Sequence, residues 1–216
     1  MSDIQNFIIE SNRFLKKDTT TYYHYKYTRY REPNNPDFLV TLKNTYNSSD
    51  YKTIQNLEEA MLEVKDCVGE FLTFIANNHY GQIPVCVVPR SLVQTNDNKM
   101  QFCFKQAIKE IIKGFNDHNR TNKFIDATNC IMRHTKTKTT HLKNTDDTGA
   151  MPYVGITKDT CNICNGIRDK FILLIDDIYT KTINIDEDCI QALYDKGARK
   201  IIFYAVARTM NEKYDF

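Results

Sequence analysis

Two adjacent carboxylates, Asp176 and Asp177, directly follow the most strongly apolar run of the chain, Phe171 to Ile175. A short loop with threonines at positions 180 and 182 comes next, and then a predicted helix start. In an open parallel sheet, ligands bind beyond the carboxyl ends of the strands, and a helix start presents N–H groups that favour an anion. Carboxylates beside an anion site indicate a ligand that combines phosphate with hydroxyl or metal-bridged groups, such as a sugar phosphate or a nucleotide.

The elements that must position this pair alternate along residues 81–216 between short apolar runs and amphipathic stretches. Alternation of this kind predicts an α/β fold with a parallel sheet of about five strands, flanked by helices. Two helices are predicted, at Phe104 to Phe115 and at Asn184 to Lys196, and the second should end at Gly197 in a left-handed cap. The predicted strands are Ile83 to Val88, Phe124 to Met132, Tyr153 to Ile156, Phe171 to Ile175 and Lys200 to Ala207.

Residues 1–80 are more polar and richer in tyrosine, and they are predicted to form an N-terminal accessory or hood region beside the core at residues 81–216. Residues 21–31 alternate as a strand does, Phe38 to Leu42 is a second short strand candidate, and residues 47–50 read as a turn. A long helix is predicted from Leu57, with Asn56 as its N-cap. The tyrosines mixed with basic residues also occur in single-strand binders, but an ordinary sheet or dimer face is the favoured interpretation.

The composition argues against several classes of protein. A net charge of +2 on 216 residues is nearly balanced, which disfavours nucleic-acid binding through the overall field. No apolar run approaches the roughly twenty residues that a membrane span needs. The first residues, Met1 to Gln5, lack the core of a signal peptide, so we expect a cytoplasmic protein without a membrane partner.

Seven cysteines are scattered along the chain, and several lie in apolar runs such as residues 85–88, as buried free thiols do. Cys161 and Cys164 form a CxxC pair. A structural zinc site would need a second pair of ligands, and His134 and His141 do not provide one at a recognisable spacing. A structural or loop role is therefore favoured for the two cysteines over a zinc site or a redox pair.

The segment from Leu173 to Ala198 reads LLIDDIYTKTINIDEDCIQALYDKGA. It resembles the phosphoribosyl pyrophosphate signature of type I phosphoribosyltransferases, above all the ComF-like, competence-associated branch, in which the pattern runs approximately LLVDDVYTTGATLDECAKALKEAGA. Further similarities are Ala207-Arg208-Thr209 at the closing strand and Val88-Pro89-Arg90-Ser91-Leu92 at the strand end that precedes the pyrophosphate loop. The resemblance spans residues 83–209, and it is specific in the last forty of them.

The resemblance implies an enzyme that uses 5-phosphoribosyl 1-pyrophosphate and Mg²⁺ to glycosylate a nitrogen nucleophile, a base or an amine, with release of pyrophosphate. It implies that Asp176 and Asp177 hold the ribose hydroxyls, directly or through Mg²⁺. Catalysis would rest on these two residues together with Arg133, whose basic loop would face the pyrophosphate. The residues implied in binding the phosphoribosyl donor or a nucleotide are Arg90, Ser91, Ile178, Tyr179, Thr180, Lys181, Thr182, Ile183 and Asn184.

The phosphate loop departs from the family pattern. The family has Thr-Thr-Gly-x-Thr where this chain has Thr180-Lys181-Thr182-Ile183-Asn184. The glycine normally lets backbone amides close around a phosphate without a Cβ in the way, whereas Thr182 offers a hydroxyl and Lys181 a positive charge. The sequence therefore leaves two functions open, the enzyme and a non-catalytic module that senses a nucleotide or the phosphoribosyl donor. The acceptor is not identified, and a homodimer stays open.

Overall fold

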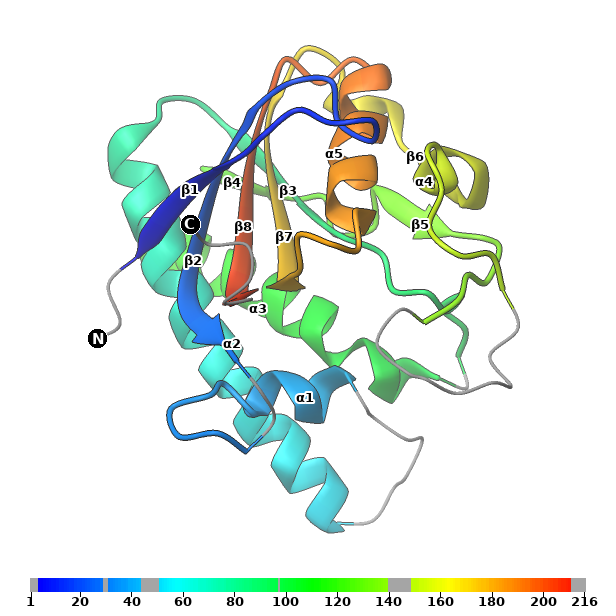
Figure 1. The fold of residues 1–216 in the computed structure, drawn as a ribbon. Helices are drawn as coiled ribbons and strands as arrows, with labels where there is room; N and C mark the ends of the chain where they lie inside the picture. Colours follow the sequence, from blue (N-terminus) through cyan, green and yellow to red (C-terminus); the bar gives the residue numbers. More distant parts are fainter. Residues whose placement is uncertain (1–3, 29–30, 44–50, 97, 140–148, 211–216) are drawn as a thin grey trace.

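The computed structural model describes residues 4–28, 31–43, 51–96, 98–139 and 149–210 (Figure 1). In this part of the chain a six-stranded sheet has the order β1-β2-β8-β7-β3-β4. Strand β1 is antiparallel to β2, and the other neighbouring strands are parallel. The strands are β1 (Gln5–Ile9), β2 (Thr19–Tyr27), β8 (Lys200–Thr209), β7 (Phe171–Tyr179), β3 (Ile83–Val87) and β4 (Phe124–Asp126). The predicted α/β class, with a mostly parallel sheet and flanking helices, is confirmed.

Helices cover both faces of this sheet (Figure 1). The long helix α2 (Tyr51–Asn78) and α3 (Cys103–His118) pack together on one face, and α5 (Ile185–Asp195) covers the other. The remaining helices are α1 (Phe38–Lys43) and α4 (Ile156–Thr160), with 3-10 turns η1 (Lys99–Phe102) and η2 (Asn165–Ile167). A small antiparallel pair, β5 (Ile131–Arg133) and β6 (Cys161–Ile163), lies beside the main sheet.

The sheet separates two hydrophobic cores. Strand β7 contributes side chains to both of them, because successive side chains of a strand point to opposite faces. Leu173 and Ile175 lie in the core beneath α2 and α3, whereas Ile172 and Leu174 lie in the core beneath α5. All four side chains are fully buried. This explains why the strand reads as an uninterrupted apolar run, and it leaves the strand little freedom to shift the carboxylates at its end.

The N-terminal region takes part in the central sheet. The boundary predicted near residue 80 does not separate two sheets, since β2 pairs with β8 from Thr21 opposite Phe203 to Tyr27 opposite Thr209. The tyrosine-rich strand is thus an interior strand between β1 and β8. No helix in the described ranges is long and apolar enough to cross a membrane.

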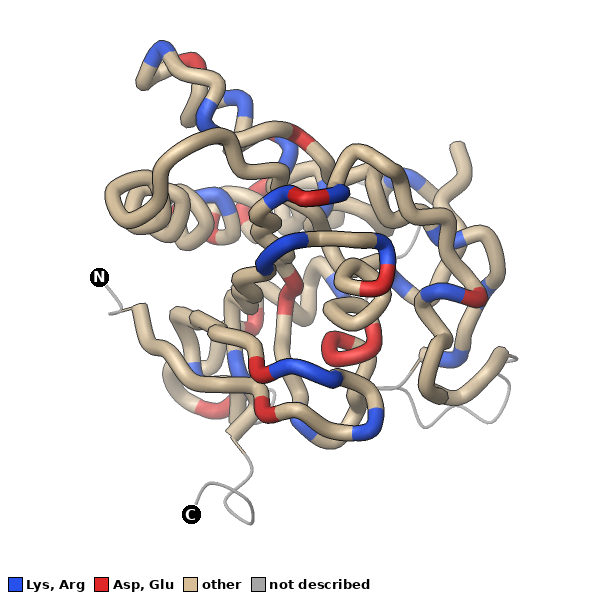
Figure 2. The backbone as a smooth tube through the Cα atoms, turned by 90° about the horizontal axis from the view of Figure 1, so that it is seen from above, with Lys and Arg blue, Asp and Glu red and all other residues tan. Residues whose placement is uncertain are grey.

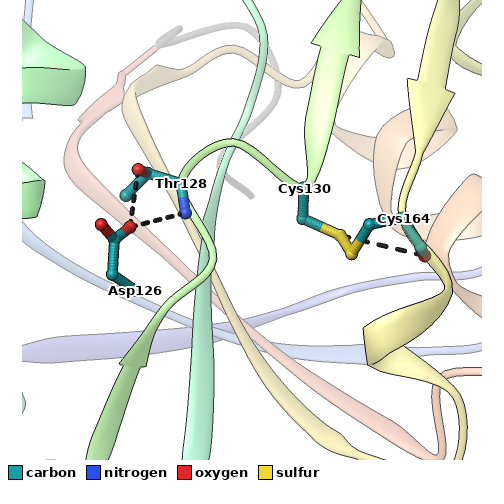
Figure 3. Close-up of a disulfide and its surroundings, with 4 residues drawn as sticks. All are labelled: Asp126, Thr128, Cys130 and Cys164. Carbon is teal, nitrogen blue, oxygen red and sulfur yellow. Dashed lines mark hydrogen bonds between the residues drawn. A yellow bond between two sulfur atoms is a disulfide. The ribbon is translucent and has the colours of Figure 1, made fainter.

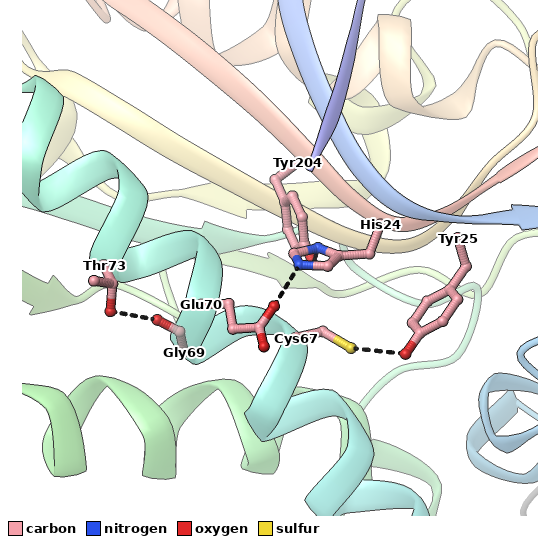
Figure 4. Close-up of polar contacts among 7 residues, drawn as sticks. All are labelled: His24, Tyr25, Cys67, Gly69, Glu70, Thr73 and Tyr204. Atoms are coloured by element: carbon pink, nitrogen blue, oxygen red, sulfur yellow. Dashed lines mark hydrogen bonds and ion pairs between the residues drawn. The ribbon is translucent and has the colours of Figure 1, made fainter. Parts of the chain in front are cut away.

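A polar cluster centred on the buried His24 joins this strand to α2 (Figure 4). The His24 ring lies 2.7 Å from the Tyr204 hydroxyl through Nδ1 and 3.3 Å from the Glu70 carboxylate through Nε2. Burial lowers the pKa of His24, and Glu70 opposes that shift. The Tyr204 ring also stacks on Phe71, with the ring centroids 4.2 Å apart. These contacts fix the long helix against the sheet.

Several predicted elements are wrong in kind or extent. Phe38 to Leu42 is helical, because Leu39 and Leu42 are both buried at helical spacing. The segment Tyr153 to Ile156 is not a strand, since Gly155 is left-handed (φ 98°) and α4 begins after it. The predicted strand Phe124 to Met132 divides into β4 and β5, and the long helix begins at Tyr51 rather than Leu57. The predicted turn at residues 47–50 lies outside the described residues.

A local turn causes the division between β4 and β5 (Figure 3). The Asp126 carboxylate accepts hydrogen bonds from the backbone N–H of Thr128, at 3.0 Å, and from its hydroxyl, at 2.7 Å. This Asx turn offers the backbone an alternative to the sheet ladder, so the chain leaves the main sheet. It then enters β5, whose last residues form one wall of the pocket described below.

Candidate functional site

The sheet has a topological switch point between β3 and β7. The chain leaves β3 through α3 toward the β4 edge, and it leaves β7 through α5 toward β8, in the opposite direction. In open α/β sheets, ligands bind outside the carboxyl ends of the strands at such a point. A pocket lies there, and both Asp176 and Asp177 line it, facing Val87 to Arg90 from β3 and the loop after it.

Asp177 has a cationic partner that the sequence did not indicate. The Lys43 ammonium, at the last residue of α1, lies 3.0 Å from Asp177 Oδ1, and about a fifth of each side chain is exposed. Burial works to lower the pKa of Lys43, but the charges of Asp177 and Asp176 outweigh it, so the net shift is upward. The same Asp177 oxygen accepts the N–H of Ile178 at 2.6 Å. Helix α1 lies below the ends of β7 and β8 in Figure 1, where it delivers this lysine to the site.

Asp176 belongs to a second pair, formed with Asp186 in the first turn of α5. Burial, and then the charge of Asp177, raises the pKa of Asp176 to about 7. Burial and then the charge of Asp176 raise the pKa of Asp186 well above its ordinary value. A hydrogen bond joins the two groups, and between two carboxyls such a bond requires a proton. Both shifts favour retention of a proton by this pair near neutral pH.

The two arginines expected at the pyrophosphate are engaged with the protein. Arg90 donates to the carbonyls of Leu42, at 2.9 Å, of Gln101, at 2.6 Å, and of Lys43. Arg133 is 7% exposed, and it donates to the Arg90 carbonyl and, at 2.6 Å, to the Thr160 hydroxyl. Both line the pocket, but their donors are bound to backbone oxygens and, for Arg133, also to the Thr160 hydroxyl. Arg90 in particular fixes the end of α1 and so places Lys43 beside Asp177.

Ser91 follows Arg90 and contacts the loop beyond β5. Its hydroxyl lies 3.1 Å from the Thr139 hydroxyl, and its carbonyl accepts the N–H of Thr137 at 2.9 Å. The two segments expected around the pyrophosphate, residues 90–91 and the loop after Arg133, are thus side by side. Residues 140–148 of that loop lie outside the described part of the chain.

The predicted phosphate loop lies directly between β7 and α5. The N–H of Ile183 bonds the Thr180 carbonyl at 3.0 Å, and Asn184 is left-handed (φ 61°) as the N-cap residue. The Thr180 hydroxyl lies 2.8 Å from the Thr209 hydroxyl of β8. Lys181 and Thr182 are exposed at the tip. The loop therefore presents a lysine and a hydroxyl to solvent at the start of a helix.

Ile178 and Tyr179, which were expected to bind the phosphoribosyl donor or a nucleotide, are turned inward. Ile178 is 7% exposed and Tyr179 3%, and the Tyr179 hydroxyl donates to Glu187 Oε1 at 2.8 Å. Tyr179 packs in the core beneath α5, against Phe7 and Phe203. Their contacts with the protein interior stabilise the start of the phosphate loop.

The cysteine expectations need one correction (Figure 3). Cys130 and Cys164 form a disulfide, whereas Cys161, the other member of the CxxC pair, is a buried free thiol. Cys86 is a buried free thiol, as expected. The disulfide closes the end of the β5–β6 pair, in which Ile131 is opposite Ile163. It thereby fixes the strand that forms a wall of the pocket.

The donor chemistry of the carboxylates fits a hard cation. Mg²⁺ in proteins is commonly held by one or two carboxylates together with substrate phosphates and waters. Asp177 offers such an oxygen, and Asp176 would offer another after losing its proton. Among the described residues no group of three or more His, Cys, Asp and Glu side chains is arranged to hold a metal ion by itself.

Charge is mixed across the molecule: basic and acidic positions are interspersed along the backbone in Figure 2.

Neither a comparison with models of known protein families nor a comparison with curated proteins finds a match for this chain.

Proposed function

We propose that this chain is a phosphoribosyltransferase-like protein that binds 5-phosphoribosyl 1-pyrophosphate, or a nucleoside 5′-phosphate, at the switch point between β3 and β7. The observation that carries the proposal is the placement of Asp176 and Asp177. They line a pocket at the carboxyl end of β7, and the loop to α5 begins three residues after Asp177. The resemblance of residues 173–198 to the signature of this family supports the same ligand.

In the proposed reaction a nitrogen nucleophile bonds carbon 1 of the ribose, and the bond from that carbon to pyrophosphate breaks, with its electron pair leaving on pyrophosphate. Bound Mg²⁺ would supply charge neutralisation at the leaving group. Asp177 would orient the ribose hydroxyls, and the loop at Thr180 to Asn184 would hold the 5′-phosphate at the start of α5. Catalysis of this kind depends chiefly on positioning and electrostatics.

Lys43 is the residue that ligand binding must rearrange. Its ammonium faces Asp177, so a ligand that takes up this carboxylate displaces the lysine from it. The displaced ammonium would then lie close enough to the ligand to pair with one of its phosphate oxygens. Arg90 and Arg133 hold backbone and side-chain oxygens of the protein, whereas Lys43 contacts the carboxylate that the ligand would take up.

The second candidate is a binding module without turnover. The engagement of both arginines favours it, because neither is poised for a leaving group. The two functions share a ligand and differ in chemistry.

The test measures thermal stabilisation first and turnover second. With Mg²⁺ present, the phosphoribosyl donor at 100 times its dissociation constant should add about 2.7 kcal/mol of stability. Asp177→Asn should lose most of that gain and alter its Mg²⁺ dependence, while Asp117→Asn, an exposed carboxylate of α3, should keep it. Absence of any shift at millimolar ligand would refute the proposal. Mg²⁺-dependent release of pyrophosphate across a panel of bases then separates the enzyme from the binding module.

A further inference from the structure

The pocket extends beyond the carboxylates toward the β4 side of the sheet, and there its walls are apolar. They come from the end of β3, from η1 and α3, and from β5. The apolar residues that line this part include Val88, Leu92, Phe102, Phe104, Ile131 and Met132. A largely apolar pocket with a few polar groups is typical of sites for small organic molecules.

Lys105, in the first turn of α3, lines the same part of the pocket. Its ammonium lies 3.0 Å from the side-chain oxygen of Gln94 and 3.5 Å from the Met132 sulfur. Both partners are uncharged, and Gln94 is an exposed side chain that a ligand can displace. Ion pairs among the described residues join His24 to Glu70, Lys43 to Asp177 and Lys65 to Glu110, and none of these involves Lys105.

The surroundings of Lys105 favour an anion. Burial lowers the pKa of Lys105, which means that the charged ammonium is incompletely solvated where it stands. An anionic ligand would replace two weak, neutral contacts by a charge-assisted hydrogen bond. Arg90 and Arg133 also line the pocket, but their donors are held by oxygens of the protein, so Lys105 is the cation with an easily replaced partner.

The charge and shape of the pocket limit what this anion can be. Asp176 and Asp177 line the other end, and a carboxylate disfavours a phosphate dianion beside it when no Mg²⁺ lies between them. The apolar walls favour a ligand with an apolar body, and the residues that line them include the aromatic Phe102 and Phe104. A single negative charge on a flat apolar ring satisfies both conditions.

We propose that this part of the pocket binds an aromatic monocarboxylate, with its ring between the apolar walls and its carboxylate on the Lys105 ammonium. Binding of such a ligand needs no phosphoribosyl donor, so it can succeed or fail independently of the proposed function. The contact with Lys105 accounts for the charge, and the contacts with the apolar walls account for the ring.

Three probes separate these contributions: benzoate, benzamide and acetate. Benzamide has the shape of benzoate without its charge, and acetate has the charge without the ring. Isothermal titration of the full chain, without Mg²⁺ or phosphoribosyl donor, should give benzoate at least tenfold tighter binding than either. Lys105→Met should reduce benzoate binding at least tenfold and bring it level with benzamide.

The matched control is Lys109→Met, which removes an exposed lysine one turn further along α3; its charge acts on Lys105 from a distance, so benzoate binding should weaken far less than in Lys105→Met. Thermal unfolding of both variants verifies that each remains folded. Should Lys105→Met prove unfolded, Lys105→Gln replaces it with the same expectation. The proposal is overturned if benzoate does not bind at millimolar concentration, if benzamide or acetate binds equally well, or if Lys109→Met loses as much affinity as Lys105→Met.

Discussion

Replacing Asp176 by asparagine should make the protein more stable above neutral pH. Asparagine has nearly the shape of a protonated aspartic acid, but it cannot ionise. In the folded protein, burial and the charge of Asp177 raise the pKa of Asp176 from 3.8 to about 7. The unfolded chain has no such burial, so there the group titrates near its ordinary value. This difference between the two states makes stability depend on pH.

The direction in which stability changes with pH follows from which state, folded or unfolded, retains the proton. Below about pH 4 the carboxyl is protonated in both states, and ionisation costs the fold nothing. Between about pH 4 and pH 7 the unfolded chain releases the proton while the folded protein retains it, so stability falls as the pH rises. Above pH 7 both states are ionised and the loss is complete. A shift of about three pKa units at 1.36 kcal/mol each corresponds to about 4 kcal/mol.

Urea unfolding from pH 4 to pH 8.5 measures this effect. Relative to its stability at pH 4, the wild-type protein should lose about 4 kcal/mol more than Asp176→Asn by pH 8. Asp186→Asn should act in the same direction, because it removes the other member of the hydrogen-bonded pair. Asp117→Asn, on the exposed face of α3, serves as the control and should follow the wild-type curve. If the free energy of unfolding changes with pH by the same amount, within about 1 kcal/mol, in the wild type and in Asp176→Asn, the pair Asp176 and Asp186 does not retain a proton as argued.

Three further predictions concern single side chains. Lys43→Met should lower the free energy of unfolding by about 1–3 kcal/mol, because it leaves Asp177 partly buried without its cation; urea unfolding checks this, and an unchanged midpoint would contradict it. Cys164→Ser should cost roughly 3–4 kcal/mol under oxidising conditions, since the disulfide spans 34 residues, and this difference should vanish in reductant. Lys181→Ala should weaken binding of the phosphoribosyl donor by about 1.5–3 kcal/mol in titration calorimetry without changing the melting temperature of the free protein. Unchanged affinity beside a clear loss in Asp177→Asn would leave the ribose site and reject the phosphate role of Lys181.

Local sequence patterns were sufficient for the elements around the site. The apolar run from Phe171 predicted a buried strand, and β7 is buried from Ile172 to Ile175. The helix after the phosphate loop was predicted to stop at Gly197, where the glycine is indeed left-handed (φ 99°). Both features depend on residues close together in the chain, so the residues themselves contain the necessary information. The carboxylates were expected directly after this strand, whereas β7 continues through them to Tyr179 and Asp176 is opposite Ala205 of β8.

Local patterns failed where burial outweighed them. Phe38 to Leu42 has the residues of a short strand, but packing of Leu39 and Leu42 against the core formed by α2 decides for a helix. Arg133 belongs to a basic loop that was expected to face the pyrophosphate, yet its guanidinium is buried against oxygens of the protein. In both cases tertiary contacts decided the conformation or the burial, and the neighbouring residues in the sequence do not predict those contacts.

The sequence alone determined that two carboxylates and a threonine-rich loop would lie together at the end of a parallel strand. Only the tertiary structure decided the charge partners and the protonation of the two carboxylates. Lys43, at the end of α1, contacts Asp177. Asp186, in the first turn of α5, contacts Asp176. Charge and protonation depend on desolvation and on partners in three dimensions, and neither can be read from the order of residues.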